Sequence, residues 1–212
     1  MKLLKLPLYL QDPNSVDCGP VCDRMILEYY GIRRSLEELQ AKLRYDAVGT
    51  SAYDNGAIFL SEGLKVKAIT AHPLLFPPDL MAKLADKNRL RERIKGLAGR
   101  LPDKADNLGT LLKFLDLGGD VCMEIPAWRH IKDAIDSESP VLALTYAKAL
   151  GNNEGGYHFI IVNGYKHGFV HITNPSPRAT NRGWFPLDRF LFAVHCCTSA
   201  DVDNGTLIVP SR

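Results

Sequence analysis

The chain has 212 residues, of which 46% are hydrophobic and 24% charged, a composition typical of an ordinary globular protein. Its 26 basic and 24 acidic residues nearly balance, and a formal charge of +2 excludes the strong field that nucleic-acid or membrane-surface binding requires. No apolar run reaches the roughly 20 residues of a membrane-spanning helix. The five cysteines, an odd number in a chain of this size, predict a reduced, cytoplasmic protein.

The chain begins with the short apolar segment MKLLKLPLYL. Lys5 and Pro7 interrupt it and no small-residue cleavage site follows, so we expect a short strand rather than a signal peptide. The next segments have helical periodicity, followed by strand alternation. Gly31 suits the left-handed end of the first helix, and Ser35 with Glu38 forms a capping box for the second. The predicted helices cover residues 18–30, 35–43 and 54–63, and the strand covers 65–70.

A helical insertion is predicted over residues 73–118, where the composition shifts to Lys, Arg, Asp and Leu with scattered Pro and Gly. The pattern predicts two or three short amphipathic helices. Charge of this kind is usually the solvated face of a helix, and the alternative is an inserted subdomain that offers a surface to a protein partner. We therefore expect one domain over residues 1–212 that carries this insertion.

The last third of the chain changes to strand periodicity. A helix is predicted from residue 128 to before Pro140, and a short helix over 187–192. The predicted strands cover residues 141–146, 157–165, 168–175 and 205–210. The turn KHG at 166–168 joins two of these strands into a hairpin. Helices that come first and antiparallel strands that come last indicate an α+β fold, not a doubly wound parallel sheet.

Cys18 is the candidate nucleophile. Gly19 and Pro20 follow it, and proline favours the first turn of a helix, so Cys18 lies at or just before a helix N-terminus. The helix dipole and free N–H groups there favour a thiolate and can bind an oxyanion. Asp17 would oppose the dipole unless its side chain caps the helix. The alternative for a free cysteine is a buried apolar residue, which is our interpretation of Cys22.

His158 is the best-placed candidate base among the six histidines, because it opens the apolar strand HFIIV directly after GNNEGG. Asn174 ends the next strand, just before Pro175, so the hairpin brings both residues to the same end. One register places them on the same face, where Asn174 can orient the imidazole. A shift by one residue separates them unless a bulge intervenes. The alternatives are a core histidine and a turn-forming asparagine.

Gln11, seven residues before Cys18, is a candidate second donor to an oxyanion, although a polar loop residue is the stronger interpretation of Gln11 alone.

The adjacent Cys196 and Cys197 would bridge to each other only with strain, so we interpret them as structural. No cysteine or histidine pair completes a zinc site with Cys18 and Cys22. The motifs for dinucleotides, for P-loop phosphates and for zinc proteases do not occur, so we predict no cofactor and no metal.

These segments together resemble a known family. The segment DCGPVCDRMILEYYG, preceded by Gln11 and followed later by YHFIIVNGYKHGFVHITNP, is similar to the papain-like peptidases that process the double-glycine leaders of bacteriocins. The resemblance covers about residues 7–72 and 119–192. It implies a papain-like cysteine peptidase fold, in which an N-terminal helical part with the nucleophile helix packs on a C-terminal antiparallel sheet.

The resemblance also implies roles for individual residues. Cys18 would be the nucleophile, His158 the base and later the acid, and Asn174 the group that orients His158. Gln11 would help to form the oxyanion hole. The sequence departs from the family in three places: the spacing from Gln11 to Cys18 is one residue longer, the third residue is usually Asp rather than Asn, and the stretch 73–118 is longer.

The leading hypothesis is a cytoplasmic, thiol-dependent hydrolase that cleaves a peptide or isopeptide amide bond of a peptide or protein substrate through an acyl-enzyme. It needs no cofactor and binds no nucleic acid. One alternative is an acyl transferase or deamidase that uses the same three residues. A second alternative is a non-catalytic peptide-binding module of the same fold.

Overall fold

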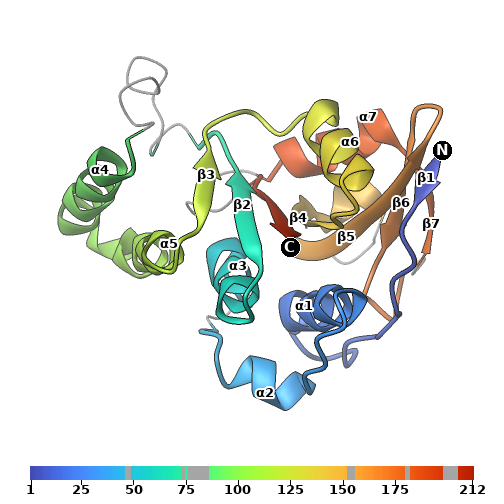
Figure 1. The fold of residues 1–212 in the computed structure, drawn as a ribbon, viewed down its shortest axis with the longest axis horizontal. Coiled ribbons are helices and arrows are strands. Elements are labelled where there is room, and N and C mark those ends of the chain that lie inside the picture. The colour runs from blue at the N-terminus through green and yellow to red at the C-terminus, as the bar shows by residue number, and fades with distance from the viewer. Residues whose placement is uncertain (46–48, 73–74, 76–85, 152–155, 180–181, 198–204) are drawn as a thin grey trace.

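The computed structural model describes residues 1–45, 49–72, 75, 86–151, 156–179, 182–197 and 205–212 (Figure 1). These residues form one sheet with helices on both faces. The helices are α1 (Cys18–Tyr29), α2 (Leu36–Gln40), α3 (Ala52–Ser61), α4 (Lys87–Arg100), α5 (Ala105–Asp116), α6 (Trp128–Asp136) and α7 (Leu187–His195), with the short 3-10 helices η2 (Pro102–Lys104) and η3 (Ala147–Leu150). The strands are β1 (Lys2–Leu3), β2 (Lys65–Ile69), β3 (Asp120–Cys122), β4 (Val141–Tyr146), β5 (Tyr157–Lys166), β6 (Phe169–Thr173), β7 (Arg182–Pro186) and β8 (Leu207–Ser211).

The sheet has the strand order β3-β2-β8-β4-β5-β6-β7, and β1 pairs with the last part of β5. The strands β4 to β7 are antiparallel, as predicted. The sheet extends beyond the C-terminal third, because β2 joins it from the first third and pairs in parallel with β3. The last strand, β8, lies between β2 and β4 and therefore connects the two halves of the sheet.

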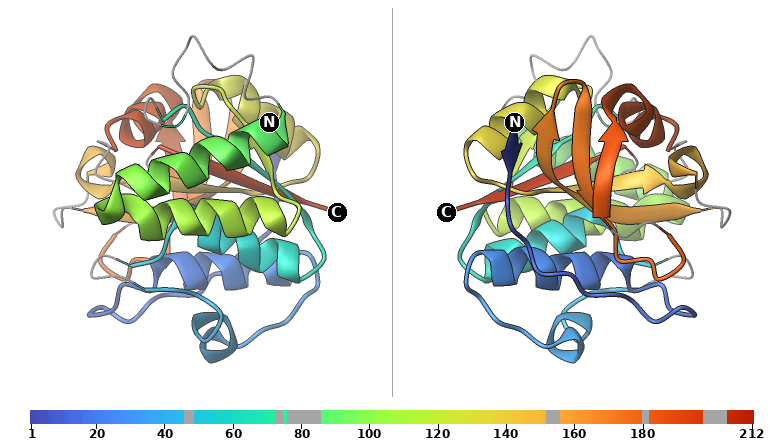
Figure 2. Two further views of the ribbon diagram at one scale, coloured as in Figure 1. Left: turned by 90° about the vertical axis from the view of Figure 1, so that its left-hand side faces the viewer. Right: turned by 90° about the vertical axis from the view of Figure 1, so that its right-hand side faces the viewer.

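The helices form two layers on the sheet. α1 packs against β5 and α3 against β2 and β8 on one face, while α6 and α7 cover the other face (Figure 1). α4 and α5 lie side by side beyond α3, and Figure 2 shows this pair at the opposite end of the molecule from the β5–β6 hairpin. None of the described helices is both long and apolar enough to cross a membrane.

Most of the predicted helices and strands are present. α2 is shorter than predicted and ends at Gln40, since Leu39 is its single buried residue. The short strands β3 and β7 were not predicted, because they lie at the two edges of the sheet and lack a clear alternation of buried and exposed residues. In the predicted helical stretch 73–118 the structure contains α4, η2 and α5, while residues 73–74 and 76–85 lie outside the described residues.

Candidate active site

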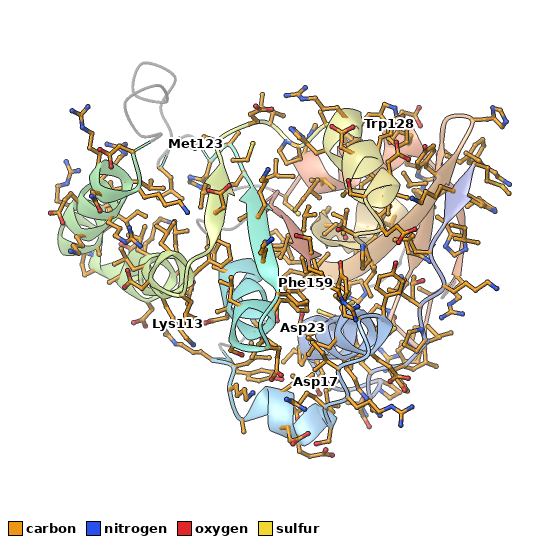
Figure 3. The ribbon with its side chains drawn as sticks, in the orientation of Figure 1. Asp17, Asp23, Lys113, Met123, Trp128 and Phe159 are labelled. Carbon is orange, nitrogen blue, oxygen red and sulfur yellow. The ribbon has the colours of Figure 1, made fainter. Side chains whose placement is uncertain are left out.

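The helix α1 begins at Cys18, as the Gly-Pro pair after this residue predicts. Asp17 occupies the N-cap position, but its side chain does not cap the helix. Its carboxylate instead accepts hydrogen bonds from Gln40 Nε2 (3.0 Å) and the Tyr45 hydroxyl (2.9 Å), and Figure 3 shows Asp17 between α1 and α2. The Val21 N–H donates to the Asp17 carbonyl (3.0 Å). Since this is the first bond of the helix, the Cys18 N–H has no acceptor within the helix itself.

The peptide group of Phe159 anchors the start of α1 to β5. The β5–β6 ladder begins at the pair Ile161–Thr173, so the strands have already separated at Phe159. Its N–H donates to the Cys18 sulfur, and its carbonyl accepts from Cys22 Sγ (3.6 Å). Cys22 is fully buried, in agreement with its interpretation as a core residue. The two cysteines thus satisfy the backbone group that the separation of the strands leaves open.

His158 lies between Cys18 and Asn174. Its Nε2–H donates to Asn174 Oδ1 at 2.8 Å, and its side chain is also hydrogen-bonded to Cys18. Asn174 Oδ1 accepts a second bond, from the Ser176 N–H (2.9 Å), which identifies this atom as the oxygen and holds it towards the ring. Because Nε2 is engaged by Asn174, Nδ1 is the ring nitrogen left for the thiol. The structure therefore brings together three of the four predicted site residues.

The electrostatics of this contact favour charge separation. Burial raises the pKa of the Cys18 thiol, but the hydrogen bond and the charge of His158 outweigh burial, so the pKa is lowered from its usual value. Burial also lowers the pKa of His158, and the hydrogen bond and charge of Cys18, with a smaller contribution from Asn174, reverse this effect and raise it. The two shifts are those of a thiolate–imidazolium pair.

Gln11 lies beside the same group of residues without a direct bond to Cys18. Its backbone N–H donates to the Pro175 carbonyl (3.0 Å), which ties its loop to the residue after Asn174. Its Nε2 donates to the Ser15 carbonyl (3.1 Å), and its Oε1 is buried without a hydrogen-bond partner among the described residues. One hydrogen of the Nε2 amide thus remains to be donated to a ligand.

Asp23 is a residue near the site that the sequence analysis did not identify. It is fully buried in α1, and neither carboxylate oxygen has a hydrogen-bond partner in the described part of the chain. Burial, and then the charge of Cys18, raise the pKa of Asp23 well above its usual value. The neutral acid is therefore favoured, and it does not oppose the Cys18 thiolate. The sequence signal that could have identified Asp23 is its position on the buried stripe of α1, five residues after Cys18.

A second group of polar side chains, Cys122, Glu124 and His130, has potential ligand atoms within 4.8 Å of one another. His130 Nδ1 accepts the Ala127 N–H (3.0 Å), so the hydrogen of the neutral ring lies on Nε2, which faces Glu124 Oε2 (2.9 Å). A metal on Nε2 would require that hydrogen on Nδ1, where Ala127 already donates. Glu124 also pairs with Arg129. The group is therefore a helix cap with one ion pair, between Glu124 and Arg129, and not a metal centre.

Comparison with protein-family models finds a match over the N-terminal part of the chain. Residues 7–84 match the model of the Peptidase C39 family. This segment includes Gln11, Cys18 and all of α1. None of the curated proteins matches the sequence.

Solved structures of peptidases share the fold of the whole chain. A double glycine motif protease from an AMS/PCAT transporter, in complex with the leader peptide, has a TM-score of 0.51 and 14% identity over 99% of this chain and 93% of that one. The peptidase domain of Streptococcus ComA, a bi-functional ABC transporter involved in a quorum sensing pathway, has a TM-score of 0.51 and 15% identity over 98% of both chains. A Bacillus anthracis protein described as a C39-like peptidase has a TM-score of 0.58 and 12% identity over 100% of this chain and 98% of that one.

The fold and the family match together define the class of this protein, which is a papain-like cysteine peptidase. Residues 7–84 match the peptidase C39 family model, and the resemblance to the double-glycine leader peptidases is confirmed. This identification favours an enzyme over the alternative of a non-catalytic peptide-binding module.

Proposed function

We propose that the protein hydrolyses a peptide or isopeptide amide bond with Cys18 as nucleophile, His158 as acid and base, and Asn174 as the residue that orients His158. The observation that carries the proposal is the position of the His158 ring, which contacts Cys18 and also donates through Nε2 to Asn174 (2.8 Å). A nucleophile, a base and an orienting group in this order are the requirements of covalent catalysis.

The chemistry follows from these positions. The Cys18 thiolate forms a bond to the substrate carbonyl carbon, and the carbonyl oxygen becomes an oxyanion held by the Cys18 N–H and, we propose, the free Nε2 hydrogen of Gln11. His158 gives its Nδ1 proton to the leaving amine as the C–N bond breaks. The neutral ring then takes a proton from water, whose oxygen attacks the thioester. Cys18 leaves as thiolate, and the acid product is released.

The substrate in this proposal is a peptide or a peptide segment of a protein. One structure of similar fold is that of a protease in complex with a leader peptide, which supports a peptide as the class of substrate. We further propose that residues 1–212 act as a single domain in the cytoplasm. The helical stretch 73–118 would then be an insertion that offers a partner surface, which the exposed and mainly basic face of α4 supports.

The experiment is a cleavage screen on a defined mixture of synthetic peptides, analysed by mass spectrometry. The wild-type chain is compared with Cys18→Ala and with Cys122→Ala, which removes a partly buried thiol outside the site. We expect new peptide termini with wild type and Cys122→Ala and none with Cys18→Ala. Cleavage by Cys18→Ala would contradict the proposal. A gain of about one mass unit without new termini would indicate a deamidase, and joined peptides would indicate a transferase.

A further inference from the structure

The β5–β6 hairpin contains a bulge at Asn163. On the turn side Gly164 pairs with His171, whereas before the bulge Val162 pairs with Ile172, so Asn163 is one extra residue on β5. A bulge of this kind shifts every residue on one side of it relative to the partner strand. The residues shifted here include the end of the hairpin that carries the candidate active site.

The bulge decides on which face of the hairpin His158 and Asn174 lie. If the pairing of Gly164 with His171 continued, His158 would be six residues from Gly164 and Asn174 three residues from His171, which places them on opposite faces. With the extra residue, Ile161 pairs with Thr173. His158 is then three residues from Ile161 and Asn174 one residue from Thr173, so both lie on the same face. The hydrogen bond of 2.8 Å between them depends on this register.

Asn163 is hydrogen-bonded to β6 on one side and to Leu4, the residue after β1, on the other. Its Oδ1 accepts from His171 Nδ1 (2.8 Å) and from the Thr173 hydroxyl (3.2 Å) on β6. Its Nδ2 donates to the Leu4 carbonyl (2.8 Å), and its backbone carbonyl accepts the Leu4 N–H (2.7 Å). Asn163 is only 3% exposed, so each of these bonds replaces one that water would otherwise make.

These bonds suit an asparagine and no other common residue of its size. The side chain uses an acceptor and a donor at once, and aspartate would lack the donor and bury a charge. Burial, together with the positive charges of Arg182 and Lys166, lowers the pKa of His171, so this ring is neutral and donates through Nδ1. Thr173 directly precedes Asn174, so Asn163 holds the residue next to the one that orients His158.

We propose that Asn163 is a positioning residue of the active site, which fixes the bulge and the Thr173 segment so that Asn174 meets His158. The inference rests on the proposed function of Cys18, His158 and Asn174. Asn163 has no direct contact with Cys18, His158 or Asn174. It acts on them through the strand register, on which their alignment depends.

The test measures the alignment at Cys18 directly. Iodoacetamide labelling rates at Cys18 are recorded across pH for wild type, Asn163→Ala and Thr173→Val, and kcat and KM are recorded with a peptide from the cleavage screen. We expect Asn163→Ala to shift the rise of labelling to higher pH and to lower kcat by up to about 100-fold with little change in KM, the effect of a small misplacement of catalytic groups. Thr173→Val removes one hydrogen bond to Asn163 and keeps the shape of the side chain. It should shift the labelling profile and kcat in the same directions, but by less.

The control is Tyr165→Phe, which removes a hydrogen bond of β5 to Asp136 (2.7 Å) outside the bulge and should leave the labelling profile unchanged. If Asn163→Ala does not fold, Thr173→Val decides alone. Wild-type profiles and kcat in the folded variants would overturn the inference while the proposed function stands. Failure of the proposed function would instead appear in the wild type, as Cys18 labelling no faster than that of Cys196.

Discussion

At the scale of single residues, the chemistry depends on two ionisable groups that are both almost fully buried. Burial alone would keep both Cys18 and His158 neutral. Their mutual hydrogen bond reverses this tendency, and the bond from Nε2 to Asn174 fixes the ring in the orientation that allows it. Asp23 is equally buried but has no such partner, and the neutral acid is favoured. The difference between the reactive Cys18 thiol and the inert Asp23 acid is therefore due to the hydrogen-bonding partner and not to burial.

Replacing His158 by Ala should shift the pH at which Cys18 becomes reactive. The thiolate forms as pH rises through the Cys18 pKa, which lies below its usual value in the wild type because of His158. Labelling by iodoacetamide should therefore remain fast on the acid side of the usual thiol pKa. In His158→Ala burial remains and the opposing interactions are lost, so the rise should move to higher pH.

The measurement is the rate of labelling at each cysteine, mapped by mass spectrometry. Cys196 is the internal control, because burial raises its pKa and it should react only on the alkaline side in both proteins. If the Cys18 profiles of wild type and His158→Ala coincide, the ion pair does not exist in solution.

At the scale of elements, the start of α1 is held in place by a close approach to α3. A Cβ on Gly19 would lie 2.3 Å from Thr50 Oγ1 and 2.8 Å from Asn55 Nδ2. Thr50 and Asn55 are themselves hydrogen-bonded to each other (3.1 Å), so neither side chain can move without losing that bond. Glycine therefore allows the helix to begin here, with Cys18 against β5.

Replacing Gly19 by Ala should destabilise the protein and displace Cys18. The added methyl group overpacks the contact with Thr50 and Asn55, which costs about 1–3 kcal/mol in the free energy of unfolding. The matched control is Gly96→Ala in α4, where a Cβ meets nothing within 4 Å and should stabilise the helix by about 0.5–1 kcal/mol. Urea unfolding measures both changes. Equal stability of the two variants would show that the space beside Gly19 adapts.

At the scale of the whole molecule, the last strand holds the two halves of the sheet together. Ile208 in β8 is fully buried and pairs with Ala68 of β2 on one side and Leu142 of β4 on the other. β4 in turn pairs with β5, which carries His158. The active site therefore depends on a strand that comes almost 200 residues after Cys18 in the chain.

Replacing Ile208 by Ala should lower the free energy of unfolding by about 2–5 kcal/mol, the usual cost of a cavity in a core. Replacing Val209, which is only partly buried, by Ala should lower the free energy of unfolding by less. Unfolding followed by circular dichroism and by tryptophan fluorescence should give one common transition for each variant. Two separate transitions would show that the half of the sheet with β2 and β3 and the half with β4 to β7 unfold as independent units.

The elements that contain the site were predictable because their signals are local. The Gly-Pro pair after Cys18 and the apolar spacing that ends at Gly31 define α1, and the turn at 166–168 defines the hairpin. The sequence also placed His158 and Asn174 at one end of that hairpin. It left open the register between them, because a bulge depends on bonds from Asn163 to distant residues such as Leu4.

By itself, the sequence determined the order and type of most elements and the few residues that can carry the chemistry, since periodicity, caps and turns act over a few neighbouring residues. Only the tertiary structure decided that Asp17 turns away from its helix, that Asp23 is buried without a partner, and that His158 and Asn174 share a face. These outcomes depend on hydrogen bonds and burial between segments far apart in the chain, which no local pattern specifies.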